Sequence, residues 1–206
     1  ALVVRNEFLE INLSDATGGI ARLHTYGRGQ NRLSQQIAWR FSREKTITIP
    51  GEGEPVTRKT WYTDMVLREH RVLADGPTLG AVETVGELMD TSAGKTLGTF
   101  RQLVRIWRGR PVAEVEIELG LPKAPEGDPW TNYVGLRFAW NDANQSLTRS
   151  LQETACLVQD ESRCESPSYL ELASESERTT ILTGGLSFHR LTGPRMLDTL
   201  LVTEGE

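Results

Sequence analysis

The feature that most constrains this chain is a regular alternation of apolar and polar residues, which recurs in short runs. The clearest run is residues 112–119, where an apolar residue at every odd position from 113 to 119 alternates with three glutamates. A period of two places successive side chains on opposite faces of an extended backbone, so each run predicts a β-strand with one buried face. Residues 8–13 and 36–41 follow the same pattern. The chain is therefore predicted to be built from strands.

Residues 100–107 are predicted to pair with residues 112–119, because the connection Arg108-Gly109-Arg110-Pro111 is short enough to close a hairpin. No window of eleven or more residues keeps the apolar spacing of a helix, and 19 glycines and 9 prolines interrupt the chain. The fold is therefore predicted to be all-β. Many strands bury their apolar faces by stacking sheets, which predicts a sandwich, and 206 residues fit one such domain. Two stretches rich in proline and glycine, residues 49–60 and 121–130, are predicted to be long loops.

Composition excludes two classes of partner. The chain carries a net charge of -5 with no basic cluster, which argues against nucleic acid because phosphate binding needs concentrated lysine and arginine. No apolar run approaches the roughly 18 residues that a membrane span needs. We therefore expect neither nucleic acid nor membrane as a partner. The chain begins at Ala1 without an initiator methionine, and we expect it to be one domain of a longer protein.

Cysteine and histidine give no pattern of a metal site. Cys156 and Cys164 lie eight positions apart, which fits neither a zinc spacing nor a redox pair, and leaves a hairpin disulfide or two free thiols as the alternatives. His24, His70 and His189 are far apart in sequence, and none has a ligand-type neighbour at close spacing. We expect no metal and no cofactor on this chain.

The acidic strand offers the first candidate for chemistry. Consecutive members of Glu114, Glu116 and Glu118 would lie roughly 7 Å apart along a strand, which matches the separation of the two carboxylates in an inverting glycosidase. The alternative is a solvated charge ladder in which Arg101 and Arg105 of the neighbouring strand pair with the glutamates. We favour the ladder, because regular alternation is typical of any solvated strand face.

A second candidate is the aromatic segment that follows the second loop. Trp130 and Tyr133 lead into the apolar residues 134–140, and Asp142 follows. Aromatic faces beside Asn, Asp and Arg hydrogen-bonding groups are the composition of a carbohydrate site, although a tryptophan at the start of a strand also packs into many sandwich cores. Core or inter-sheet packing is predicted for three further tryptophans: Trp39, Trp107 and Trp140.

The third candidate is residues 183–201, near the C-terminus. Gly184 and Gly185 can supply a positive φ or a close backbone approach, and His189 and Arg190 place a titrating imidazole beside a permanent cation. Such a pair suits anionic or hydroxyl-rich ligands. In the alternative interpretation, Arg190 and Arg195 pair with Asp198 or with other surface acids.

Several motifs follow one another in a recognisable order: residues 6–10 (Asn-Glu-Phe-Leu-Glu), 17–20 (Thr-Gly-Gly-Ile), 74–77 (Ala-Asp-Gly-Pro), 138–140 (Phe-Ala-Trp) and 183–201. Along most of its length the chain resembles the C-terminal β-sandwich region of family 38 glycoside hydrolases, the α-mannosidase family. The resemblance implies a large two-sheet supersandwich of the galactose-mutarotase-like type. It also implies a parent enzyme that cleaves α-mannosides with retention, using a zinc ion and an aspartate nucleophile.

In that family the zinc ligands and the nucleophile belong to an N-terminal α/β catalytic domain, which no part of this sequence resembles. We therefore expect residues 1–206 to be a single, non-catalytic sandwich domain of a larger glycoside hydrolase, with zinc in the parent catalytic domain. Its expected partners are the N-terminal catalytic domain of the same polypeptide and carbohydrate. The alternatives are a free-standing carbohydrate-binding module and a mutarotase-like sugar enzyme. The candidate carbohydrate contacts are His189, Arg190, Trp130, Tyr133 and Asp142.

Overall fold

A computed structural model describes residues 2–26, 28–47 and 56–204, and within these ranges every helix or strand is a β-strand. All strand pairs are antiparallel and belong to three sheets. The all-β prediction is confirmed. Because no helix occurs in the described ranges, none of them holds a helix that could cross a membrane.

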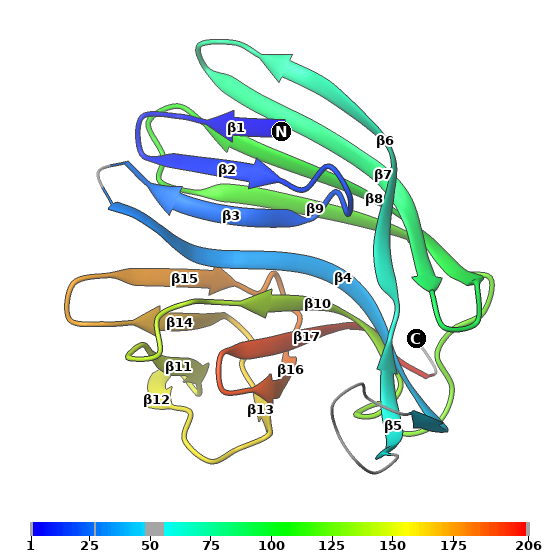
Figure 1. Cartoon of the computed structure of the whole chain (residues 1–206). Helices are drawn as coiled ribbons and strands as arrows, with labels where there is room; N and C mark the ends of the chain where they lie inside the picture. The colour runs from blue at the N-terminus through cyan, green and yellow to red at the C-terminus, as the bar shows by residue number, and fades with distance from the viewer. Residues whose placement is uncertain (1, 27, 48–55, 205–206) are drawn as a thin grey trace.

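The largest sheet has nine strands in the order β1-β2-β3-β4-β10-β17-β16-β13, with β5 paired to β4. Its strands are β1 (Leu2–Arg5), β2 (Leu9–Leu13), β3 (Ile20–Thr25), β4 (Arg28–Ile47), β5 (Val56–Tyr62), β10 (Tyr133–Ala139), β13 (Arg163–Glu165), β16 (Phe188–Gly193) and β17 (Met196–Val202). The 20-residue strand β4 runs the length of the molecule and joins the N-terminal strands to the C-terminal ones (Figure 1).

The other two sheets have four strands each. One has the order β6-β7-β8-β9, and the other has the order β12-β11-β14-β15. The first contains β6 (Asp64–Asp75), β7 (Leu79–Asp90), β8 (Lys95–Trp107) and β9 (Ala113–Gly120). The second contains β11 (Ser146–Leu151), β12 (Thr154–Leu157), β14 (Tyr169–Ala173) and β15 (Arg178–Leu182).

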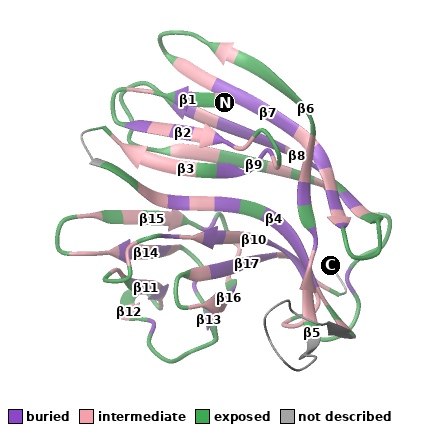
Figure 2. Ribbon diagram, in the orientation of Figure 1, coloured by how far each residue is buried: buried purple, intermediate pink, exposed green. Residues whose placement is uncertain are grey.

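Both small sheets pack against one face of the large sheet. Alternate residues of β4 supply this face: Leu33 packs with Leu170 and Leu172 of β14, while Ile37 packs with Leu88 of β7. A third cluster joins β1, β2 and β3 to β7 and β8. Buried residues accordingly concentrate along β4, β7, β8, β10 and β17 (Figure 2). The predicted sandwich is confirmed, with its second layer divided between two sheets.

The hairpin predicted from residues 100–107 and 112–119 is confirmed, since β8 pairs with β9 from Ile106 opposite Ala113 onward. The alternating runs 8–13 and 36–41 lie in β2 and β4, as predicted. The loop predicted for residues 121–130 is confirmed, because that stretch contains no strand. The loop predicted for residues 49–60 is wrong for Val56 to Thr60, which belong to β5 and pair with β4. Residues 49–55 lie outside the described ranges.

Two predicted packing features have different outcomes. Trp39 and Trp140 are buried as predicted, but Trp107 is 38 % exposed. It is the last residue of β8 and follows the buried Ile106, so the alternation of the strand turns it toward solvent, where its indole N–H donates to Glu114. The cysteines are two free thiols: Cys156 lies on β12 and Cys164 on β13, in different sheets.

Candidate functional site

The face of the large sheet that is turned away from both small sheets carries a row of charged residues across four adjacent strands. The register places Arg137 of β10 opposite Asp198 of β17, Asp198 opposite Arg190 of β16, and Arg190 opposite Arg163 of β13. Residues directly opposite one another on antiparallel strands share a face. We call Arg137, Asp198, Arg190 and Arg163 the polar row.

Asp198 is fully buried within this row, so its carboxylate needs partners. Its Oδ2 accepts a hydrogen bond from the hydroxyl of Tyr133 at 2.6 Å, and its Oδ1 accepts one from Nε of Arg137 at 3.1 Å. Burial, followed by the negative charge of Asp198, raises the pKa of the Tyr133 phenol well above its usual range. The phenol therefore stays protonated and acts as a donor at neutral pH.

Gly135 makes room for this arrangement. Its position lies between Tyr133 and Asp198 on the same sheet face, and a Cβ there would come within 3.1 Å of the Tyr133 ring and 2.9 Å of the Thr199 carbonyl oxygen. Real Cβ atoms essentially never approach other heavy atoms at the shorter of these distances. The absent side chain thus lets the tyrosine ring lie along the sheet and reach Asp198.

Two more residues extend the polar surface from the row toward β5. Arg40 of β4 lies opposite both Tyr133 of β10 and Tyr62 of β5. The guanidinium of Arg137 stacks over the Tyr62 ring at 3.8 Å, and that of Arg40 lies 6.0 Å from the same ring. Burial and then the charge of Asp198 raise the pKa of Tyr62, so this phenol also stays neutral at physiological pH.

Arginines on both sides fix the loop that precedes β10. Arg190 donates from Nη1 to the carbonyl oxygen of Trp130 at 2.6 Å, and Arg40 donates from Nη1 to the carbonyl oxygen of Thr131 at 2.6 Å. From within the loop, Asp128 accepts the backbone N–H of Trp130 at 3.0 Å. The backbone of Trp130 is therefore held by strands β4 and β16 together.

The side chain of Trp130 is half-buried and carries two neighbours on the same face. The ring of Phe188 meets it edge-on with centroids 6.0 Å apart, and the guanidinium of Arg163 lies 5.2 Å from its centroid. Phe188 is 49 % exposed. We call Trp130, Phe188 and Arg163 the aromatic ledge. An aromatic surface fixed beside guanidinium donors has the chemistry to bind the C–H face and the hydroxyls of a sugar.

His189 and Arg190, predicted as a pair, point to opposite faces because they are consecutive strand residues. His189 is fully buried between the sheets, where Nδ1 lies 3.0 Å from the Thr199 hydroxyl and Nε2 lies 3.1 Å from the Ser166 carbonyl oxygen. Burial lowers its pKa. With both ring nitrogens engaged in the interior, His189 is out of reach of a ligand on the ledge, and only Arg190 joins Trp130.

The remaining two candidates occupy different places. Tyr133 is fully buried and supports the row through Asp198, so it acts behind the surface. Asp142 lies beyond the opposite end of β10 from Trp130 and lines a separate open pocket of about 670 Å³, together with Arg22 and Asn31. The structure therefore brings together Trp130, Arg190 and Tyr133 and leaves Asp142 and His189 elsewhere.

The predicted ion pairs have mixed outcomes. On β8 and β9, Arg101 bonds Glu118 at 2.7 Å, and Arg105 bonds Glu116 at 3.0 Å and Glu114 at 3.3 Å, which confirms the charge ladder. The alternative in which Arg190 and Arg195 pair with Asp198 or with other surface acids is wrong, since neither arginine forms an ion pair with a described residue. Tyr133 and Arg137 already occupy both carboxylate oxygens, and the two arginines donate instead to the Trp130 and Asn141 carbonyls.

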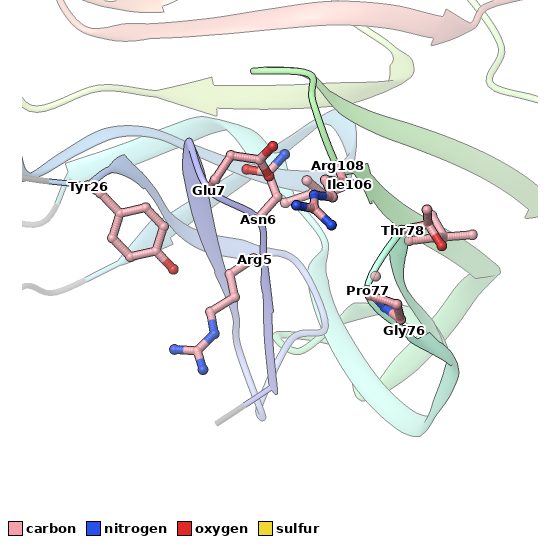
Figure 3. A pocket seen from close by; sticks show the side chains of 11 residues that line it. Arg5, Asn6, Glu7, Tyr26, Gly76, Pro77, Thr78, Ile106 and Arg108 are labelled. Atoms are coloured by element: carbon pink, nitrogen blue, oxygen red, sulfur yellow. The ribbon is translucent and has the colours of Figure 1, made fainter.

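Another open pocket, of about 300 Å³, lies where β1 meets the β6-β7 turn (Figure 3). Arg5 and Tyr26 line it on one side and Gly76, Pro77 and Thr78 on the other, with Asn6 and Glu7 between them. Asn6 is fully engaged there, since its amide donates to two backbone carbonyls and its oxygen accepts two backbone N–H groups. Residues 6–10 and 74–77, which are far apart in sequence, thus meet at this pocket.

Five residues of this surface were not among the site residues predicted from the sequence: Arg40, Tyr62, Arg137, Arg163 and Phe188. One signal was available: Arg137 is the single charged residue in the otherwise apolar residues 134–140.

No group of His, Cys, Asp or Glu able to hold a metal ion occurs in the described ranges. No family model matches this chain, and no curated protein matches it.

Proposed function

We propose that this chain is the non-catalytic β-sandwich of a glycoside hydrolase similar to family 38, and that it contacts carbohydrate through Trp130 and Arg190. In this proposal the zinc ion and the nucleophile belong to an N-terminal catalytic domain of the same polypeptide. The sandwich packs against that domain and lines one wall of the carbohydrate cleft. Two observations support the proposal: the sequence motifs in the family's order, and the all-β sandwich of the large sheet with its two smaller partners.

The observation that carries the proposal is the hydrogen bond between Arg190 and the Trp130 carbonyl oxygen, at 2.6 Å. It fixes the backbone of Trp130 beside the polar row, on the sheet face that neither small sheet covers, and the ring itself packs against Phe188 and Arg163. A ring with its backbone fixed and two neighbours in contact loses little freedom when a sugar stacks on it, which reduces the entropic cost of binding. The guanidinium of Arg190 keeps further N–H groups that can donate to sugar hydroxyls.

The catalytic part of the proposal is tested by an activity assay on the purified chain. A chromogenic α-mannoside is incubated with the chain, with and without added zinc. We expect no turnover above the buffer blank in either case, because the nucleophile is assigned to a separate domain. Turnover that rises with the concentration of the chain and persists through repurification would refute this assignment.

The binding part is tested with two tryptophan variants. Trp130→Ala removes the ring of the ledge, whereas Trp107→Ala removes a ring that is 38 % exposed on a different sheet. Titration with methyl α-mannoside should show weak, saturable binding, and Trp130→Ala should weaken it about tenfold, as expected for one lost stacking contact of roughly 1.4 kcal/mol. Trp107→Ala should leave it unchanged. Equal loss in both variants would contradict the role given to Trp130.

A second candidate function is a free-standing carbohydrate-binding module. The observation in its favour is the exposure of Phe188 beside Trp130, which widens the aromatic surface without help from another domain. Micromolar affinity of the isolated chain for a mannose-containing oligosaccharide would favour the module, and millimolar affinity would favour the accessory domain. The mutarotase-like alternative gains no support from His189, because both of its ring nitrogens are engaged.

A further inference from the structure

The guanidinium groups around the aromatic ledge outnumber the carboxylates that face them. Arg40, Arg137, Arg163 and Arg190 share this face of the sheet, whereas the acids on the same face of β13 and β17 are Glu165 and Asp198. The two carboxylate oxygens of Asp198 accept hydrogen bonds from Tyr133 and Arg137. Glu165 is exposed two residues from Arg163 and forms no ion pair within the described ranges. The surface therefore carries an excess of positive charge on a chain whose net charge is -5.

The two outermost arginines have only neutral partners. Arg190 bonds the backbone carbonyl of Trp130, and the guanidinium of Arg163 lies over the Trp130 ring. Neither arginine belongs to an ion pair with any described residue. Arginine keeps its charge at every physiological pH, and its planar fork fits the paired oxygens of a carboxylate or a sulfate.

The two arginines of β8 show what a neutralised face looks like. On β8, Arg101 bonds both Glu83 and Glu118, and Arg105 bonds both Glu114 and Glu116. Those residues stand on neighbouring strands, as the members of the polar row do, but each guanidinium there meets carboxylates. The acids needed for pairing are therefore present in the chain, and the fold directs them away from the ledge.

The neighbouring tyrosines do not supply the missing negative charge. Burial and the carboxylate of Asp198 raise the pKa of both Tyr62 and Tyr133, so both phenols remain neutral. Asp128, at the base of the loop, uses an oxygen to accept the Trp130 backbone N–H. The positive charges of Arg163 and Arg190 are therefore not balanced by an ion pair with a described residue and are available to an anionic ligand.

We propose that Arg163 and Arg190, beside Trp130, form a subsite for an anionic substituent, a carboxylate or a sulfate, on the sugar that stacks against the aromatic ledge. This inference rests on the proposed carbohydrate contact of the ledge and names the class of carbohydrate that it prefers. The Trp130 ring binds the sugar face, and the two guanidinium groups bind the charged substituent. A neutral sugar uses the ring alone.

The test compares three methyl α-mannosides on the full chain by calorimetry: the neutral glycoside, its 6-sulfate and the corresponding uronate. Sodium sulfate at matched ionic strength is a fourth ligand. We expect the sulfated and uronate forms to bind about tenfold more tightly than the neutral glycoside, and inorganic sulfate to bind much more weakly than either. The advantage of the charged sugars should shrink as sodium chloride is raised toward 0.5 M.

Arg163→Gln and Arg190→Gln are each expected to reduce the advantage of the charged sugars at least fivefold. The matched control is Arg71→Gln, which removes the same charge from β6 and should leave it unchanged. The Gln side chain keeps hydrogen-bonding capacity, and the two target residues lie near the surface. A urea titration of each variant shows whether it remains folded.

Several outcomes would overturn the inference. Equal affinity for neutral and charged mannosides would do so while leaving the carbohydrate contact of Trp130 intact, so the two proposals fail separately. If inorganic sulfate binds as tightly as the sulfated sugar, the site binds anions in general and does not recognise the sugar. Tight binding of a polyglutamate peptide, with no binding of the charged sugars, would assign the arginines to an acidic protein partner.

Discussion

Tyr133 donates its phenolic hydrogen to Oδ2 of Asp198 across 2.6 Å, and both side chains are fully withdrawn from solvent. The contact joins β10 to β17 at the polar row, of which Asp198 is a member. It also satisfies one oxygen of the buried carboxylate, whose second oxygen accepts a hydrogen bond from Arg137. The tyrosine thus keeps the acid in place, and the acid keeps one arginine of the row in place.

Tyr133→Phe should destabilise the fold measurably. The substitution keeps the ring and removes the donor, so Oδ2 of Asp198 stays buried without a partner. We expect the free energy of unfolding in urea at pH 7.5 to fall by about 2 kcal/mol, the usual cost of orphaning a buried polar atom. Tyr26→Phe, at a 47 % exposed position, should change it by less than about 0.5 kcal/mol. Similar effects of the two substitutions would show that the hydrogen bond contributes little.

The same tyrosine predicts a loss of stability in alkali. Its pKa is raised in the folded chain by burial and by Asp198, whereas in the unfolded chain it titrates near 10. Its contribution is therefore complete below about pH 10 and is lost as the pH rises above that value, at up to about 1.4 kcal/mol per pH unit. Unfolding measured from pH 8 to pH 11 should show a steeper fall for the wild-type chain than for Tyr133→Phe, which keeps the slopes due to the raised pKa values of Tyr62 and Cys164. Parallel curves would argue against the perturbed phenol.

His189 predicts a loss of stability in acid. Burial lowers its pKa below the ordinary value of 6.5, so the unfolded chain binds the proton more readily than the folded chain. Its contribution is complete above about pH 6.5 and is lost as the pH falls below that value, which amounts to at most about 1.4 kcal/mol between pH 7.5 and pH 5.5. In His189→Gln this part of the pH dependence should disappear from urea titrations at the two pH values. An unchanged difference would mean that the imidazole titrates alike in both states.

Gly135→Ala should disturb the row without touching a charged residue. A Cβ at this position would lie 3.1 Å from the Tyr133 ring and 2.9 Å from the Thr199 carbonyl oxygen, so the ring must shift away from Asp198. The expected cost is about 1–3 kcal/mol of unfolding free energy, as for other overpacked sites. Gly29→Ala is a suitable control, because its Cβ would meet its nearest neighbour at 3.7 Å, an ordinary contact. A neutral effect of Gly135→Ala would show that the tyrosine has room to move.

The strands could be predicted from sequence where the information was local. The alternation in residues 112–119 fixes which side chains face out, and a short hairpin fixes their neighbours, so the ladder of Arg101 and Arg105 followed from the pattern. Val56 to Tyr62 shows the limit. The nearby Pro50, Gly51, Gly53 and Pro55 predict a loop, and pairing with β4 overrides that local preference.

The candidate site was less predictable because it depends on register between distant strands. Arg137, Arg163, Arg190 and Asp198 form one row only because β10, β17, β16 and β13 are adjacent in a particular alignment. Sequence alone therefore identified Trp130 and Arg190 as separate candidates without the bond between them. Treating residues 188–193 as a strand would have placed His189 and Arg190 on opposite faces, and that step was available from the alternation alone.

The most direct test of the carbohydrate contact follows the indole N–H signals of the five tryptophans by NMR during titration with methyl α-mannoside. Single substitutions assign the signals. We expect the Trp130 signal to move saturably, while those of Trp39, Trp61, Trp107 and Trp140 stay in place. A saturable shift at Trp107 or Trp61 with no change at Trp130 would contradict the account, because the sugar would then bind away from the ledge that Arg190 holds.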